Sequence, residues 1–219
     1  METSQLIHEL AGRSQAVRRL ASPWRRATVW LAISAVYAVA VIFIQPLPFS
    51  QWQMEPRFAI EQIATIATAV TAAIAAFWSV VPGSDRRWVL LPLVPLAVWL
   101  MTLGEACVRD WRLLGWAGLA PGTDWDCVWL AAVVGFVPAA AMVAMLRRGA
   151  PLVPRVSLAL AAVAVAAFAN FVIRLHHPGD LGLTILAWHF GMVAVLACIA
   201  GLLARHVLKW PHVEGLSRG

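Results

Sequence analysis

Residues 58–81 read FAIEQIATIATAVTAAIAAFWSVV, and this stretch decides the class of fold. It holds one charged side chain, Glu61, in a run that is otherwise dominated by apolar and small residues. A run of about 20 such residues is long enough to cross a hydrocarbon core of about 30 Å as a helix. The stretch therefore predicts a transmembrane helix.

Five further stretches of similar length and composition occur along the chain. Of its 219 residues, 61% are hydrophobic and 13% charged, and the mean hydropathy is +0.76. An average soluble domain has about 25% charged residues, so we expect little soluble structure. The composition predicts an all-α, polytopic membrane protein with six transmembrane helices, near residues 27–45, 58–81, 88–106, 127–146, 154–175 and 183–204.

The lysines and arginines are distributed unevenly over the ends of these spans. If the N-terminus is cytoplasmic, thirteen of the 17 lie on that side. Because cytoplasmic loops carry an excess of cations, we predict that both termini are cytoplasmic. The chain then divides into a cytoplasmic segment at 1–26, a bundle at 27–204 with an outer loop at 107–127, and a cytoplasmic tail at 205–219. The formal net charge of +6 then reflects anchoring to the lipid bilayer rather than direct binding of nucleic acid.

The cytoplasmic segment 1–26 contains an amphipathic stretch. Ser4 can cap a helix that Pro23 ends, and one face of this helix is apolar. The apolar face consists of Leu6, Ile7, Leu10, Val17 and Leu20, which we call the apolar stripe. Two interpretations remain open: the helix rests on the inner leaflet, or it docks its apolar stripe in the groove of a cytoplasmic partner.

Two of the three cysteines, Cys107 and Cys127, delimit the outer loop, CVRDWRLLGWAGLAPGTDWDC. On the predicted topology they lie in an oxidising compartment, where paired cysteines commonly form disulfides. Metal ligation and free thiols are the alternatives for the resting state. An accessible cysteine pair that changes between such states can sense metals or oxidants. We therefore regard Cys107 and Cys127 as candidate sensing residues.

Further polar side chains belong to the same outer ends of the spans. They are His176, His177, His189, Asp180, Glu61 and Glu105. Imidazole, thiolate and carboxylate groups are metal ligands, so these residues form a candidate accessory metal or polar site. Snorkelling, or a hydrogen bond to a neighbouring helix, is the alternative for Glu61 and Glu105. No definite cofactor is indicated, and a transient metal ion at the outer face is a candidate.

Two other classes of protein compete with a sensor. A small haem-binding or redox membrane protein would use His189 with His176 or His177 as axial ligands, whereas a structural membrane subunit would need none of these side chains. The cytoplasmic loops VPGSDRRW and RRGAPLVPR are too short to hold a catalytic domain. We therefore do not expect an enzyme.

A set of motifs follows in order along the chain. It comprises AVRRLASPWRRATVW, RFAIEQIATIATAVTAAIAAFWSVVPG, RRWVLLPL, GEACVRDW with DWDC, MLRRGAPLVPR, and HHPGDLGLTILAWHFG. This ordered set resembles the NrsF family, the six-span negative regulators of sigma F in proteobacteria. The resemblance covers almost the whole chain.

Membership in this family would imply an anti-sigma factor of the bacterial inner membrane. Such a protein holds an extracytoplasmic-function sigma factor until an envelope stress releases it. The resemblance implies metals or oxidants as the stress, and Cys107 and Cys127 as the sensing pair. It also favours the partner-binding interpretation of residues 1–22. The sequence departs from anti-sigma factors more broadly in having no cytoplasmic His-x3-Cys-x2-Cys motif, so sigma binding cannot use that zinc module.

Overall fold

A computed structural model of the chain describes residues 3–12, 20–44, 56–119, 125–149 and 153–176, together with Gly191, Cys198, Ile199 and Leu202. Every regular element within these residues is a helix, which confirms the predicted all-α class. The elements are α1 (Thr3–Gly12), α2 (Pro23–Ile44), α3 (Pro56–Trp78), η2 (Arg86–Leu90), α4 (Leu93–Leu114), η3 (Gly115–Leu119), α5 (Trp125–Leu146) and α6 (Pro154–His176).

Five helical stretches in the described part of the chain are long and apolar enough to cross a membrane: Pro23–Ile44, Pro56–Trp78, Arg86–Ala117, Trp129–Leu146 and Pro154–His176. They correspond to the first five predicted spans. The sixth, 183–204, lies outside the described residues except for Gly191, Cys198, Ile199 and Leu202. The sixth span and the orientation of the termini therefore stay predictions.

Proline begins three of the long helices. Pro23, Pro56 and Pro154 are the first residues of α2, α3 and α6. Proline suits this position because its missing N–H would have no intrahelical partner there and its φ is already helical. The sequence positions of these prolines thus set where three helices start.

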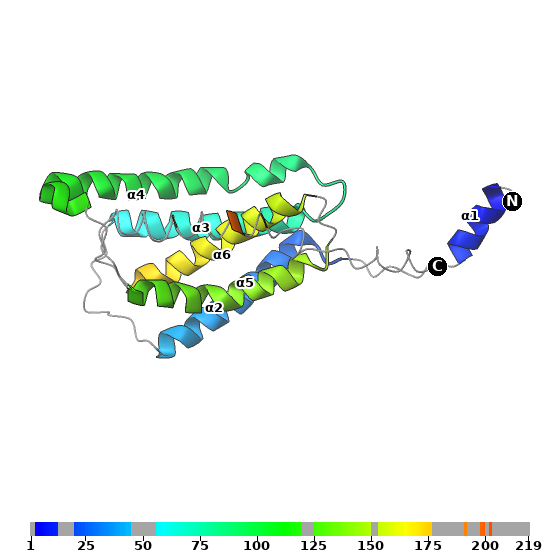
Figure 1. The fold of residues 1–219 in the computed structure, drawn as a ribbon, viewed down its shortest axis with the longest axis horizontal. Helices are drawn as coiled ribbons and strands as arrows, with labels where there is room; N and C mark the ends of the chain where they lie inside the picture. Colours follow the sequence, from blue (N-terminus) through cyan, green and yellow to red (C-terminus); the bar gives the residue numbers. More distant parts are fainter. Residues whose placement is uncertain are drawn as a thin grey trace.

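The helices α3 and α6 form the centre of the bundle. α3 packs against α2, α4 and α6, and α5 packs against α2 and α6, so the long helices lie side by side (Figure 1). Both helices bury several small residues: Ala69, Ala72, Ala73 and Ala76 of α3, and Ala161, Ala164 and Ala167 of α6. Small side chains let two membrane helices approach closely, which explains why this pair is central.

The helix α4 lies at the edge of the bundle and extends beyond the predicted end of its span. Only 17% of its membrane-span residues are buried, compared with 61% for α6. Hydropathy places the end of the span near residue 106, whereas α4 continues to Leu114 and ends at Gly115, where φ is +60°. The intervening residues contain no Gly or Pro that would stop a helix. Much of the outer loop predicted at 107–127 is therefore helical.

Candidate functional site

The segment 1–26, which is predicted to be cytoplasmic, contains the short helix α1, which lies apart from the bundle (Figure 1). This helix starts at Thr3, so Ser4 lies within it instead of capping it. Within the apolar stripe, Ile7 is 62% exposed and Leu20 is 39% exposed. Leu6 and Leu10 belong to α1 but their side chains lie outside the described residues, as does Val17. Whether the stripe binds lipid or a partner stays a prediction.

The two candidate sensing cysteines lie on different helices. Cys107 is a residue of α4, half-buried and with a free thiol. Cys127 is the third residue of α5, but its side chain lies outside the described residues. On α4, Cys107 stands one helical turn before Asp110, a buried acid. The pairing of the two cysteines therefore stays a prediction.

The candidate accessory residue Glu61 forms a buried ion pair. Arg174 Nε lies 2.9 Å from Glu61 Oε1, and Arg174 Nη2 lies 3.2 Å from Glu61 Oε2. Both side chains are about nine-tenths buried, and Arg174 Cζ lies 5.6 Å from the centroid of the Phe58 ring. Sequence reasoning identified Glu61 but missed Arg174 as its partner. The sequence did offer a signal: Arg174 is an opposite charge, and it lies at the end of its span that is predicted to be on the same side as Glu61.

Glu105 belongs to a separate ion pair, with Arg57. Arg57 Nη1 lies 2.6 Å from Glu105 Oε1, and both side chains are about half-exposed. Arg57 and Glu61 are one turn apart on α3, so α3 binds α4 through the first residue and α6 through the second. The two glutamates thus connect three helices, and they do not share one polar site.

The other accessory candidates are only partly described. The His176 Nδ1 donates to the Val172 carbonyl oxygen of its own helix at 3.1 Å. His177, Asp180 and His189 lie outside the described residues. Among the residues that the structure does describe, no group of three or more His, Cys, Asp or Glu side chains is placed to hold a metal ion. The metal and haem interpretations therefore stay predictions.

A seam of hydrogen bonds between α2 and α5 was not predicted from the sequence. Trp30 Nε1 donates to the Pro138 carbonyl oxygen at 2.9 Å, and the Tyr37 hydroxyl donates to the Val133 carbonyl oxygen at 2.9 Å. Pro138 lies inside α5, where proline interrupts the helical hydrogen bonds. The two donors are aromatic side chains in an apolar span. Because aromatic residues in such spans equally often face lipid, the sequence alone did not indicate these hydrogen bonds.

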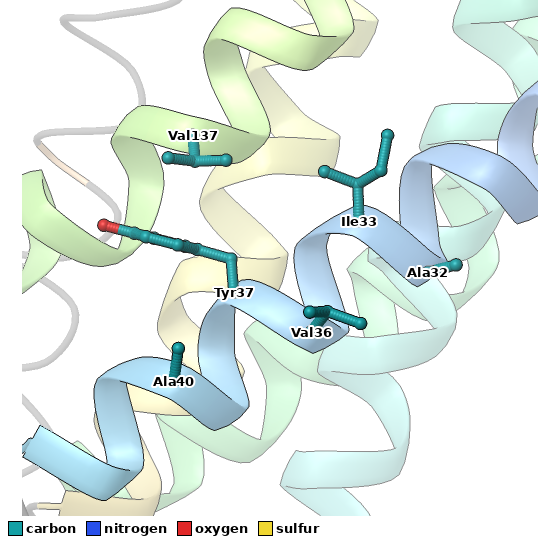
Figure 2. A pocket seen from close by; sticks show the side chains of 6 residues that line it. All are labelled: Ala32, Ile33, Val36, Tyr37, Ala40 and Val137. Carbon is teal, nitrogen blue, oxygen red and sulfur yellow. The ribbon is translucent and has the colours of Figure 1, made fainter.

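A shallow groove accompanies this seam on the surface of the bundle. It is lined by Ala32, Ile33, Val36, Tyr37, Ala40 and Val137. Figure 2 shows Tyr37 reaching from α2 toward α5, beside Val137. Apart from the Tyr37 hydroxyl, which is already hydrogen-bonded, these side chains are apolar. The groove therefore suits contact with hydrocarbon.

The ends of α2, α3 and α5 that are predicted to face the cytoplasm meet at Arg26. Its Nη2 donates to the Met145 carbonyl oxygen of α5, and its Cζ lies 4.6 Å from the centroid of the Phe77 ring of α3. Arg26 is 5% exposed. Sequence reasoning counted Arg26 among the cations that face lipid headgroups and so missed this contact.

These features define a polytopic helical membrane protein whose helices are joined by buried polar contacts. The model of the NrsF family, described as negative regulator of sigma F, matches residues 10–210. The chain belongs to this family, as its motifs indicated. No curated protein and no solved structure matches it. Membership implies a negative regulator of a sigma factor, with a sigma factor as its partner.

Proposed function

We propose that the chain is a membrane-bound anti-sigma factor of the inner membrane. It holds an extracytoplasmic-function sigma factor through the cytoplasmic segment 1–26 and releases it when a metal or an oxidant acts on Cys107 and Cys127. The observation that carries the proposal is the family match over residues 10–210, in a chain with five apolar helices of membrane-spanning length. The chain acts by binding and not by catalysis.

The stimulus acts at the outer ends of α4 and α5. α4 packs mainly on α3, whereas α5 packs on α2 and α6, so a link between Cys107 and Cys127 would join two helices that have different neighbours. Oxidation takes two electrons and two protons from the thiols to the oxidant and forms one S–S bond. A metal ion bound by both thiolates would displace the same protons. Either change restrains two helix ends that are otherwise held separately.

The contacts of α3 connect this outer end to the cytoplasmic segment. Glu105, two residues before Cys107, binds Arg57 of α3. At the other end of α3, Phe77 packs against Arg26 of α2, and α2 continues from the cytoplasmic segment. A displacement of α4 therefore has a continuous physical connection to residues 1–26.

The free energy that such a switch requires is attainable. To change the sigma factor from about 99% held to about 99% free, the stimulus must stabilise one arrangement by about 5.5 kcal/mol relative to the other. A complete structural zinc site supplies about 10 kcal/mol or more, so a site with fewer ligands could supply the smaller amount needed here. Only part of the free energy of metal binding therefore needs to stabilise one arrangement of the bundle relative to the other.

The test is to purify the tagged chain from its native membrane in mild detergent and identify bound proteins by mass spectrometry. We expect a stoichiometric sigma factor that is lost when residues 1–22 are deleted. Deletion of the tail 205–219, on the same predicted side, is the matched control and should retain the sigma factor. A preparation that contains haem or a respiratory partner, and no sigma factor, would contradict the proposal.

A further inference from the structure

Two adjacent arginines near the start of α2 lie in opposite environments. Arg25 is exposed, whereas Arg26 is 5% exposed. The distribution of cations predicts that both anchor the helix to lipid headgroups. A buried guanidinium cannot do so, and Arg26 therefore acts inside the bundle.

The Arg26 guanidinium contacts two helices besides its own. The hydrogen bond to the Met145 carbonyl oxygen connects α2 to the inner end of α5, and the stacking on Phe77 connects α2 to the inner end of α3. Phe77 is fully buried, so its ring is held in place by the packing around it. A cation over an aromatic face is stabilised most where water is excluded. Arg26 thus fixes the inner end of α2 at the point where the cytoplasmic segment joins it.

Other features oppose this contact. Arg26 Nη1 is buried and has no hydrogen-bond partner within the part of the chain that the structure describes, and a buried polar group without a partner is costly. Arg148, just beyond the end of α5, repels the Arg26 charge. Favourable and unfavourable contributions therefore meet at one side chain, and loss of the Arg26 contacts removes both kinds.

The rest of α2 is held independently of Arg26. Trp30 and Tyr37 lie on the same face of α2, one and three turns further along, and donate to α5. The Trp30 ring also packs edge-on against Phe168 of α6, with ring centroids 6.0 Å apart. Loss of the Arg26 contacts would leave these interactions in place. It would also leave the edge-on contact between Trp24 and Trp88, whose ring centroids lie 5.9 Å apart. We therefore expect a wider range of positions for the inner end of α2 and not unfolding of the bundle.

We infer that Arg26 is a positioning residue: it sets the direction in which the cytoplasmic segment leaves the bundle and thereby controls the grip on the sigma factor. The inference rests on the proposed function, because it assumes that the part of segment 1–26 that precedes α2 holds the sigma factor. It assigns the regulation of that grip to one buried side chain of α2.

The position of the inner end of α2 can be measured without a sigma factor. Spin labels on genetically encoded amino acids at Leu20 and Val153, both exposed, leave the native cysteines intact. Pulsed electron paramagnetic resonance on the full chain in lipid nanodiscs then gives the distribution of distances between the two labels, which lie just before the starts of α2 and α6. The variants are Arg26→Gln, Arg26→Lys and, as the matched control, Arg25→Gln.

We expect a narrow distance distribution in the unchanged chain and in Arg25→Gln, and a broader one in Arg26→Gln. Arg26→Lys keeps the charge near Phe77 but lacks the planar fork of donors, so we expect an intermediate width. If Arg26→Gln fails to accumulate, the distance distribution of Arg26→Lys decides whether Arg26 positions α2. In parallel, we measure the fraction of the sigma factor that is not bound to the chain in the absence of any stimulus. This fraction should rise about tenfold in Arg26→Gln, which corresponds to a loss of about 1.4 kcal/mol in binding free energy.

Two results would overturn the inference. An Arg26→Gln distribution as narrow as that of the unchanged chain would show that Arg26 does not position α2. A broader distribution with the sigma factor held as tightly as in Arg25→Gln would show that the position does not control the grip. If even the unchanged chain copurifies with no sigma factor, the proposed function fails, and the distances still decide whether Arg26 positions α2.

Discussion

Arg174 and Glu61 form a two-point ion pair between α6 and α3, with nitrogen–oxygen distances of 2.9 and 3.2 Å. Removing one partner leaves the other as a buried, uncompensated charge, which costs about 3–5 kcal/mol. We therefore expect Glu61→Ala and Arg174→Ala each to lower the free energy of unfolding in detergent by about this amount. Chemical unfolding followed by circular dichroism measures it.

The double variant Glu61→Leu with Arg174→Met is the informative comparison. Because buried ion pairs can often be replaced by apolar side chains without loss, we expect it to be more stable than either single variant. A double variant that loses the sum of the two single effects would show that the side chains act independently.

The ion pair between Arg57 and Glu105 should contribute much less. Both side chains are about half-exposed, and pairs of this kind typically contribute about 0–1 kcal/mol. We expect Glu105→Gln to change the free energy of unfolding by less than about 1 kcal/mol, with a difference that shrinks as salt is raised. If Glu105→Gln is as destabilising as Glu61→Ala, the pair is buried in the membrane-embedded protein.

Gly149 should not tolerate a side chain. A Cβ at this position would lie 2.6 Å from Val80 Cγ2 and 2.8 Å from Val80 Cβ, and Val80 is fully buried. Overpacking of this kind costs about 1–3 kcal/mol, so we expect Gly149→Ala to lower the melting temperature. Gly104→Ala is the control: its Cβ would meet nothing within 4 Å, and alanine favours the helix. Equal melting temperatures for the two variants would contradict this packing.

The sensing prediction concerns Cys107 and Cys127 together. If their chemical change is the stimulus, the variant Cys107→Ser with Cys127→Ser should hold the sigma factor and fail to release it on addition of cadmium or diamide. A reporter gene transcribed by the copurifying sigma factor measures release. Cys198→Ser, at an exposed cysteine, should respond normally. Induction that persists in the double variant would exclude the sensing role.

The helices could be predicted from the sequence, but their partners could not. Hydropathy locates the apolar stretches because each must cover the hydrocarbon core, and all five described spans follow it. Whether Glu61 meets Arg174 depends on how α3 and α6 are rotated about their axes, which hydropathy does not determine. The pairing is therefore known only from the packed bundle.

Two further differences have local physical causes. Hydropathy marks where the apolar stretch of α4 ends. The helix nevertheless continues through residues 107–114, which include three charged side chains, because its hydrogen bonds do not require apolar side chains. Arg25 and Arg26 are equivalent in a count of cations, yet the periodicity of α2 turns Arg26 inward, in line with Trp30. A count of cations predicts how the chain is oriented in the membrane. It does not identify a single arginine that packs inside the bundle.

The most direct test of the central claim is photo-crosslinking from the cytoplasmic segment in living cells. A photoreactive amino acid at Ile7, which is 62% exposed in α1, should crosslink to a sigma factor before stimulus and lose this product after it. The same amino acid at Arg87, exposed in η2 on the predicted cytoplasmic side, should give no such product. Crosslinking from Ile7 to lipid alone, with or without stimulus, would contradict the claim that this segment holds the sigma factor.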